Sequence, residues 1–483
     1  MIKKLLRLPQ VIPIILTLLL IAIMAWVRLD IGNHRYFDPD EFMYLNWAYH
    51  VAHGSVPYRD FMMFATPLYV YFLTPLYLFW HGIDPIRVAR IVSWIISLAL
   101  AGSVGLAFWT HKKSWLALVA AALVLFLPMP SDKLLEIRPD NLSLLFFMAG
   151  LAVFGSPVTM GILFGLSLLT LQKTVLLVAV ATVFLLKRKT LVPYAVGLVI
   201  PLGLFLLWAI ATGSPQTVLY SVTKLAQEHI NQVARFNQLP LNFYFLPNAI
   251  YYGAPGLSPG LIANHLLWIL AVISALALTL KLFVKRNQRA LVSALPALLF
   301  FTAMIQYIWL SPLKFPQYLL SAAIFVAWLC ADLINNILHS KRMSNSVPAG
   351  SLFVFLFFGA GVAAWVFWQV NQPKRFWTND GTYQKITRIL DRIPTTDYVF
   401  DLEGRTIYFP YPYYACCLAL GQFDSILFHQ HPTIRDSLKA TKTKYIYQAE
   451  IARIAALPQK DADFIFANYK PEENGELYVA KNW

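Results

Sequence analysis

The stretch RYFDPDEFMYLNWAYHVAHG, residues 35–54, follows the first long apolar segment of the chain. It places three carboxylates, those of Asp38, Asp40 and Glu41, within four positions. An Asp before a Pro, with a Glu three residues after that Asp, is typical of a capped helix start, and acidic side chains complement the positive end of the helix dipole. The sequence therefore predicts a helix that begins here, and capping alone is one explanation of the clustered acid.

The composition around this stretch is that of a membrane protein. The chain of 483 residues is 58% hydrophobic and 13% charged, with a mean hydropathy of +0.58. Apolar runs of about 20 residues recur, each long enough for a helix to cross a bilayer. We therefore expect an α-helical polytopic membrane protein. Its net charge of +15 then reflects basic cytoplasmic loops and does not indicate nucleic acid.

Eleven segments are predicted to span the membrane, with the N-terminus in the cytoplasm and the first span uncleaved. A further segment, 66–80, is interrupted by two prolines and rich in Tyr and Phe, which predicts that it lies in the outer interface. The eleven segments are 11–27, 86–110, 115–127, 142–154, 158–169, 175–186, 191–211, 261–284, 291–310, 318–338 and 351–370.

The charges agree with this topology and are distributed unevenly between the two faces. Lys and Arg fall in nearly every predicted cytoplasmic loop, as expected. Ten of the eleven acidic residues before residue 371 fall on the predicted outer face, and Asp332 is the exception. Two outer loops, 30–85 and 212–260, are long. The outer face is therefore where we expect chemistry that uses carboxylates.

Two domains are expected from the change in composition after residue 370. Residues 1–370 form the transmembrane catalytic domain, and residues 371–483 form a small soluble α/β domain that an odd number of spans places outside the cytoplasm. In this second part TYQKITRILDRI predicts an amphipathic helix, and DYVFDL, TKYIYQA and DFIFANY predict strands. PEENG predicts a hairpin loop before ELYVAK.

Ionisable side chains stand beside apolar segments at four places on the predicted outer face, where they are costly and often functional. Each also has an ordinary explanation as a helix cap, an interface anchor or a lysine that extends to the interface. The residues are Asp38, Asp40 and Glu41; Glu136, Arg138 and Asp140 in SDKLLEIRPDNLSLLF; Lys173 in LTLQKTVLL; and Lys314 in SPLKFPQYLL, with Arg59 and Asp60 as further candidates.

Together these residues suit a reaction of an anionic lipid. Cations would bind a phosphate group, and a carboxylate would take the proton of an acceptor hydroxyl. A divalent metal ion, Mg or Mn, held by Asp40 and Asp140 would help the phosphate to leave.

The stretch DPDEFMYLNWAYHVAHGSVPYRDF resembles the first outer loop of GT-C glycosyltransferases, which use polyprenyl-phosphate-linked sugars and include the protein O-mannosyltransferases and the lipid A aminoarabinose transferases. EIRPDNLSLLF resembles the second acidic motif of that superfamily, and LQKTVLL resembles its lysine-bearing turn. The resemblance covers residues 1 to about 190 and becomes diffuse beyond them. In the first loop it rests on Asp40, Glu41, Tyr44, Gly54, Pro57, Tyr58 and Asp60.

The resemblance implies an inverting glycosyltransferase of the EC 2.4 class, in the plasma (cell inner) membrane, with metal dependence left open. Its partners would be a polyprenyl-phosphate-sugar donor, a glycan, lipid or protein acceptor, and the bilayer. The implied roles are Asp40 as general base; Glu41 and Asp140 as further catalytic carboxylates; Lys173, Arg138 and Lys314 on the donor phosphate; and Tyr44, Tyr58, Arg59 and Asp60 at the substrate.

Two other functions stay open on the sequence. A secondary transporter or flippase of lipid-linked sugars would also need many spans and outer charges, although the internal repeats and midplane charges typical of transporters are not evident. A polymerase or ligase of surface polysaccharide would share the donor chemistry and differ in its acceptor.

Overall fold

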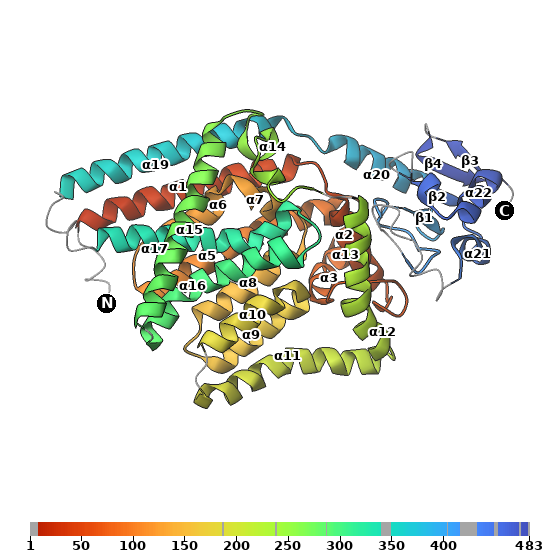
Figure 1. Cartoon of the computed structure of the whole chain (residues 1–483). Helices are drawn as coiled ribbons and strands as arrows, with labels where there is room; N and C mark the ends of the chain where they lie inside the picture. The colour runs from red at the N-terminus through yellow and green to blue at the C-terminus, as the bar shows by residue number, and fades with distance from the viewer. Residues whose placement is uncertain are drawn as a thin grey trace.

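The computed structural model describes residues 8–185, 188–236, 239–285, 287–339, 349–402, 404–415, 432–448, 453–472 and 475–481. Long helices pack side by side, and a small sheet lies at one end, beside the C-terminus (Figure 1). The helices of the first part are α1 (Leu8–His34), α2 (Pro39–Ala52), α3 (Leu68–Leu73), α4 (Leu76–Phe79), α5 (Asp84–Lys112), α6 (Ala117–Phe126), α7 (Pro128–Ser131), α8 (Pro139–Ala152), α9 (Pro157–Thr170), α10 (Val175–Leu185), α11 (Leu191–Ala211), α12 (Pro215–Tyr220), α13 (Ala226–Phe236), α14 (Ala249–Tyr252), α15 (Pro259–Lys285), α16 (Gln288–Ile305), α17 (Leu320–Leu338) and α19 (Ala349–Asn371).

Six helical segments of the described chain are long and apolar enough to cross a membrane, as in a multi-pass membrane protein. A seventh arises if α6 and the segment Pro128–Leu135, which meet at a bend of 92°, count as one span. The six lie in α1, α5, α11, α15, α16 with the turn after it, and α17 with the turn before it.

The predicted spans are helical, but their number is not confirmed. Helices α8, α9 and α10 occur where spans were predicted, yet they have only 14, 14 and 11 residues. About 20 residues are needed to cross a bilayer upright. The predicted interfacial segment contains the short helices α3 and α4, whose exposed side chains include Phe72, Leu78 and Phe79.

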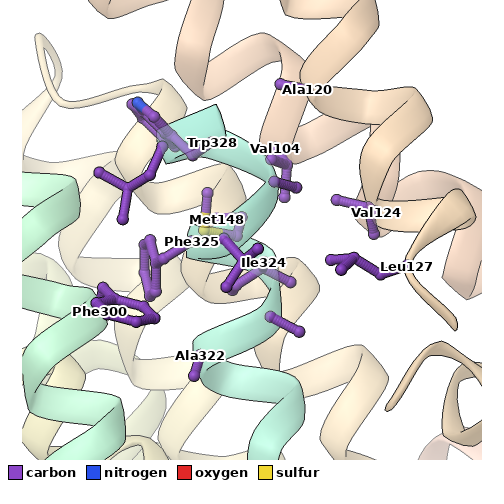
Figure 2. Close-up of a cluster of buried hydrophobic side chains, with 14 of the residues drawn as sticks. Val104, Ala120, Val124, Leu127, Met148, Phe300, Ala322, Ile324, Phe325 and Trp328 are labelled. Atoms are coloured by element: carbon purple, nitrogen blue, oxygen red, sulfur yellow. The ribbon is translucent and has the colours of Figure 1, made fainter. Parts of the chain in front are cut away.

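The core of the membrane part surrounds α17. Figure 2 shows Ile324, Phe325 and Trp328 of this helix among side chains from its neighbours, including Val104 of α5 and Met148 of α8. All five side chains are buried. A helix that is apolar on all sides is expected at the centre of such a bundle, and α17 therefore supports the surrounding helices.

The C-terminal part contains α20 (Asp380–Arg392), α21 (Ile434–Ala440), α22 (Gln459–Asn468) and a four-stranded sheet in the order β1-β2-β4-β3. Strand β1 (Val399–Asp401) is parallel to β2 (Tyr445–Tyr447), whereas β4 (Leu477–Ala480) is antiparallel to both β2 and β3 (Tyr469–Glu472). The predicted helix and the first two predicted strands are confirmed, and β3 and β4 pair as neighbouring antiparallel strands. The predicted hairpin loop PEENG includes residues 473 and 474, which lie outside the described residues.

The predicted strand DFIFANY is wrong, because this segment is helical as far as Asn468. Its aromatic and β-branched residues favoured a strand, but the buried positions are Asp461, Ala462 and Ile465. A spacing of three and four residues buries one face of a helix. Packing of that face has outweighed the local preference.

The C-terminal part packs against the predicted outer loop 30–85. The amide of Asn46 in α2 donates to the carbonyl of Ile407 at 3.3 Å, and the N–H of Met62 donates to the carbonyl of Tyr414 at 2.8 Å. The Tyr414 hydroxyl donates to the carbonyl of Tyr58 at 2.7 Å. These contacts place the C-terminal part on the same side of the helices as α2.

Candidate active site

The predicted helix start at Asp38 is confirmed and has the form of a capping box. The Asp38 side chain accepts from the N–H of Asp40 at 3.1 Å, and Oε1 of Glu41 accepts from the N–H of Asp38 at 2.9 Å. Pro39 takes the first helical position, where its missing N–H breaks no helical hydrogen bond. The turn fixes the backbone that carries Asp40 and Glu41.

The carboxylate of Glu41 is fully buried and joins three segments. Oε1 lies 2.8 Å from Nη2 of Arg90 in α5 and 3.8 Å from Nη1 of Arg35. Oε2 accepts from the N–H of Ile137 at 2.9 Å. A carboxylate enclosed in this way stabilises its surroundings and is not open to a substrate, so we interpret Glu41 as a positioning residue.

Arg138 lies among four carboxylates, at the residue before α8. Its Nη2 lies 2.6 Å from Oδ2 of Asp40, and its Nη1 lies 3.1 Å from Oε2 of Glu136 and 3.4 Å from Oδ1 of Asp38. Its Nε is 3.8 Å from Oδ2 of Asp140. One guanidinium thereby connects the acidic turn before α2 with the acidic start of α8.

Lys173 approaches the same place from the turn after α9. Its ammonium pairs with the carboxylate of Asp140 and lies 4.6 Å from the ring centroid of Tyr318. The Gln306 amide donates to the Lys173 carbonyl at 2.9 Å and holds the backbone of this turn. The structure therefore brings Asp40, Arg138, Asp140 and Lys173 together.

These residues belong to a continuous network of ion pairs, which we call the charge cluster. It contains six acidic and six basic side chains, so its formal charge is zero. Each buried ion would cost several kcal/mol without a partner, which accounts for the balance. The members are Asp38, Asp40, Glu41, Asp132, Glu136 and Asp140 with Arg35, Arg90, Lys133, Arg138, Lys173 and Lys374.

One edge of the charge cluster is accessible. The side chain of Asp40 is 37% exposed, and those of Asp38 and Lys173 are each 23% exposed. The side chains of the other nine members are at most 8% exposed. A substrate can therefore contact Asp40 and Lys173, with Arg138 directly behind them.

Asp38 and Asp40 differ in their acidity. Burial raises the pKa of Asp40 above its usual value, and the charges of Asp38 and Glu136 add to this, although Arg138 opposes it. Burial acts on Asp38 in the same direction, but Lys133 and Arg138 outweigh it and lower the pKa of Asp38. Asp40 is therefore the better proton acceptor of the two, because a carboxylate with a raised pKa binds a proton more readily.

The contacts of Lys314 are with backbone carbonyls and not with members of the charge cluster. Its ammonium donates to the carbonyls of Tyr307, Ile308 and Ser311 at 2.8, 3.1 and 2.5 Å. These carbonyls belong to the end of the π-helical turn after α16. No ion pair within the described ranges joins Lys314 to the cluster, so the structure gives this lysine a capping role.

Of the four predicted substrate residues of the first loop, Tyr44 lies near Asp40 and Arg138, whereas the other three make their contacts elsewhere. Arg59 and Asp60 form an exposed pair of their own at 2.8 Å. Tyr58 is buried, and its hydroxyl donates to the carbonyl of Ala65 at 2.6 Å. Tyr44 is buried against the ring of Tyr69. Of these four, only Tyr44 lies on the helix that carries Asp40.

The two carboxylates predicted to hold a metal ion, those of Asp40 and Asp140, lie on either side of the Arg138 guanidinium. Arg138 and Lys173 already lie against these two carboxylates. Within the part of the chain that the structure describes, no group of three His, Cys, Asp or Glu side chains is arranged to hold a metal ion. The chemistry derived below uses the cations of the chain itself, and the metal ion stays a prediction.

Sequence reasoning did not assign a role in the site to Arg35, Arg90, Lys133 or Lys374. Arg90 is a cation inside a predicted span, and such residues often mark a functional site. Arg35 stands three residues before Asp38 in the opening stretch. Lys374 belonged to the other predicted domain, and only the packing of the chain reveals its partner.

Two membrane enzymes share this architecture. The crystal structure of the oligosaccharyltransferase of Archaeoglobus fulgidus aligns over 97% of this chain and 74% of its own, with 13% identity and a TM-score of 0.60. The complex of that enzyme, AglB, with an inhibitory peptide and a dolichol-phosphate aligns over the same shares, with 13% identity and a TM-score of 0.54. ArnT from Cupriavidus metallidurans, bound to undecaprenyl phosphate, aligns over 82% of this chain and 84% of its own, with 15% identity and a TM-score of 0.52.

The chain shares its fold with these two enzymes. No protein-family model and no curated protein matches the sequence. At 13% to 15% identity the structural likeness establishes the fold, and the activity has to be argued from the residues of the site.

Proposed function

We propose that the protein is a membrane glycosyltransferase that transfers a sugar from a polyprenyl-phosphate donor to an acceptor hydroxyl on the extracytoplasmic face. The observation that carries this proposal is the accessible edge of the charge cluster, where Asp40 lies against Arg138 and Lys173 lies against Asp140. The GT-C fold supports it, because solved structures with this fold hold dolichol-phosphate or undecaprenyl phosphate.

Arg138 and Lys173 are the groups suited to the donor phosphate. An ammonium has three N–H donors, so Lys173 can hold Asp140 and a phosphate oxygen together. Arg138 is 5% exposed and lies immediately behind the edge. Charge-assisted hydrogen bonds are stronger where water is excluded. Asp140 then keeps both cations in place rather than contacting the sugar.

Asp40 is the group suited to act as general base. The acceptor hydroxyl oxygen forms a bond to the anomeric carbon while the bond from that carbon to the phosphate oxygen breaks. The hydroxyl proton passes to a carboxylate oxygen of Asp40, and the bonding electron pair leaves with the polyprenyl phosphate. Arg138 and Lys173 stabilise the negative charge that develops on this leaving group. A single displacement of this kind inverts the anomeric carbon.

The proposed location is the plasma membrane, with the active site and the C-terminal part outside the cytoplasm. The contacts of Tyr414 with residues of the first loop support one common side for both. The distribution of Lys and Arg over the loops supports the orientation.

The test is deletion of the gene in its host, followed by mass spectrometry of surface glycans and glycolipids. Loss of one sugar substituent is expected, with recovery when the wild-type gene is returned and no recovery with Asp40→Asn. A matched control is Asp84→Asn, because Asp84 is 56% exposed and pairs only with Arg87 among the interactions described. Full recovery by Asp40→Asn would contradict the proposal. If the protein were a flippase, the deletion strain would instead accumulate unflipped donor. Extracts of that strain supplied with donor on the outer side would still transfer the sugar.

A further inference from the structure

We infer that Lys374, at the entry to the C-terminal part, is a positioning residue for Asp40 and acts through a relay of buried ion pairs. The inference rests on the proposed function insofar as Asp40 is the base. It goes beyond that function because it makes the docking of the C-terminal part a condition for an ordered active site.

The first step of the relay joins Lys374 to Asp132. The ammonium of Lys374 lies 3.1 Å from Oδ1 of Asp132, and the two side chains are 4% and 1% exposed. Lys374 lies in the turn Gln372–Phe376, directly after α19. Asp132 follows α7, beyond the 92° bend, so this pair fastens the start of the C-terminal part to the broken helix.

The second step passes through Arg35. Its Nε lies 2.9 Å from Oδ2 of Asp132, and its Nη2 lies 2.5 Å from Oε1 of Glu136, with none of the Arg35 side chain exposed. Because Arg35 contacts both carboxylates, a change in the charge around Asp132 alters how strongly Arg35 is held by Glu136.

The third step reaches the base. Glu136 also binds Lys133 at 2.6 Å and Arg138 at 3.1 Å, and Arg138 in turn holds Asp40 at 2.6 Å. Asp132 and Glu136 each contact at least two cations, Arg35 and Arg138 each contact at least two carboxylates, and Asp40 ends the path at Arg138. The relay therefore has no break between Lys374 and Asp40.

A second set of contacts from the same turn supports the relay. The amide of Asn379 donates to the carbonyl of Asn33 at 2.8 Å and to that of Arg35 at 3.4 Å. The ring of Trp377 packs edge-on against Tyr36 at 5.3 Å between centroids. The start of the C-terminal part thus holds both the side chain and the backbone of the segment that leads into Asp38.

Loss of the Lys374 charge should weaken the contact between Arg138 and Asp40. Asp132 would keep Arg35 as its main partner, so Glu136 would lose part of the attraction of Arg35 and draw Arg138 away from Asp40. Removing the Asp132 charge as well would restore the balance, since one charge of each sign would then be absent. A role in packing alone would not be repaired by this second change.

The charged or titratable groups near Asp40 in the described chain are Arg138, Asp38, Glu136, Asp140, Tyr44 and Tyr318.

The experiment compares full-length wild type, Lys374→Met, Lys374→Arg and the double variant Lys374→Met/Asp132→Asn in lipid nanodiscs. Lys444→Met is the matched control, since Lys444 lies in the same part of the chain, is 55% exposed and pairs with Asp397 at the surface. Two readouts are used: the pH profile of sugar transfer, and hydrogen–deuterium exchange of the backbone amides of Asp38, Asp40 and Glu41, which needs no activity.

For Lys374→Met we expect kcat to fall by between about tenfold and about 100-fold while KM for the donor changes by less than about threefold. The acid limb of its pH profile should move to higher pH, because Asp40 loses part of its contact with Arg138. Exchange at Asp38, Asp40 and Glu41 should become faster. Lys374→Arg and the double variant should recover most of both properties, and Lys444→Met should match wild type.

Wild-type exchange and an unchanged pH profile in Lys374→Met would overturn the relay, as would a double variant no better than the single one. If wild type itself transferred no sugar, the proposed function would fail, and the exchange data would still decide whether Lys374 orders the start of α2.

Discussion

Nη2 of Arg138 lies 2.6 Å from Oδ2 of Asp40, although 98 positions of sequence separate the two residues. This contact joins the proposed base to a cation suited to the donor phosphate. When a phosphate binds, it shares the positive charge of Arg138 with Asp40. Donor binding and the basicity of Asp40 are therefore expected to be coupled.

The first prediction concerns Asp40→Asn. The amide has nearly the same shape but cannot accept the proton, so the rate of transfer should fall by roughly 10²- to 10⁴-fold. Asp40 is partly exposed, so expression and membrane insertion should be retained. Turnover with purified protein measures the effect, and Asp84→Asn serves as the control. An Asp40→Asn variant with wild-type turnover would show that another group accepts the proton.

The second prediction concerns pH. Asp40 acts as a base only when ionised, so kcat/KM should fall as the pH drops through its pKa. Burial raises this pKa above the ordinary value of 3.8. The acid limb of the profile should therefore lie above pH 3.8. The measurement is a series of kcat/KM values at different pH. An acid limb at or below pH 3.8 would count against Asp40 as the base.

The third prediction separates the two lysines that the family resemblance assigned to the donor phosphate. Lys173→Ala should weaken binding of undecaprenyl phosphate by about tenfold or more, because a charge-assisted contact is lost. Lys224→Ala is the control, since Lys224 is exposed. Binding can be measured by titration of the protein in nanodiscs. Unchanged affinity in Lys173→Ala would remove Lys173 from the donor site.

Lys314→Ala should behave differently from Lys173→Ala. Its ammonium donates to three backbone carbonyls, and loss of such partners costs about 1–3 kcal/mol. The thermal unfolding temperature should therefore fall while donor affinity is retained. Loss of affinity at a normal unfolding temperature would instead support the phosphate role that the resemblance implied.

The fourth prediction concerns Glu41→Gln. Glu41 is fully buried and neutralises Arg90 and part of Arg35. Removing one partner of a buried ion pair costs about 3–5 kcal/mol, so the free energy of unfolding should drop clearly. Thermal or denaturant unfolding in detergent measures this. A variant with wild-type stability and no activity would indicate that Glu41 contacts the substrate directly.

The fifth prediction concerns topology. A reporter fused after Trp483 should lie outside the cytoplasm, and a cysteine introduced at Asp84 should be labelled from the same side. A cysteine at Lys189 should be labelled from the opposite side, because Lys and Arg favour the cytoplasm. Labelling of positions 84 and 189 from one side would overturn the proposed orientation.

Much of the site could be predicted because its signals are local. Asp38, Pro39 and Glu41 specify a helix start through their own backbone preferences and hydrogen bonds. The sequence placed Asp40, Asp140, Arg138 and Lys173 beside apolar segments on one predicted face, but it did not predict the ion pairs among them. Lys314 and the pair Arg59–Asp60 carried similar signals yet lie elsewhere, because a short motif does not specify which segments approach one another.

The sequence by itself determined that this chain is helical and apolar, that a capped helix begins at Asp38, and that acid gathers on one face. Composition, hydrophobic period and capping act over a few residues, so they can be read without the fold. Only the tertiary structure decided that Glu41 is enclosed and Asp40 accessible. It also decided that Lys374 of the C-terminal part completes the charge cluster. Burial and ion pairing depend on which distant segments pack together, and a local sequence signal does not specify that packing.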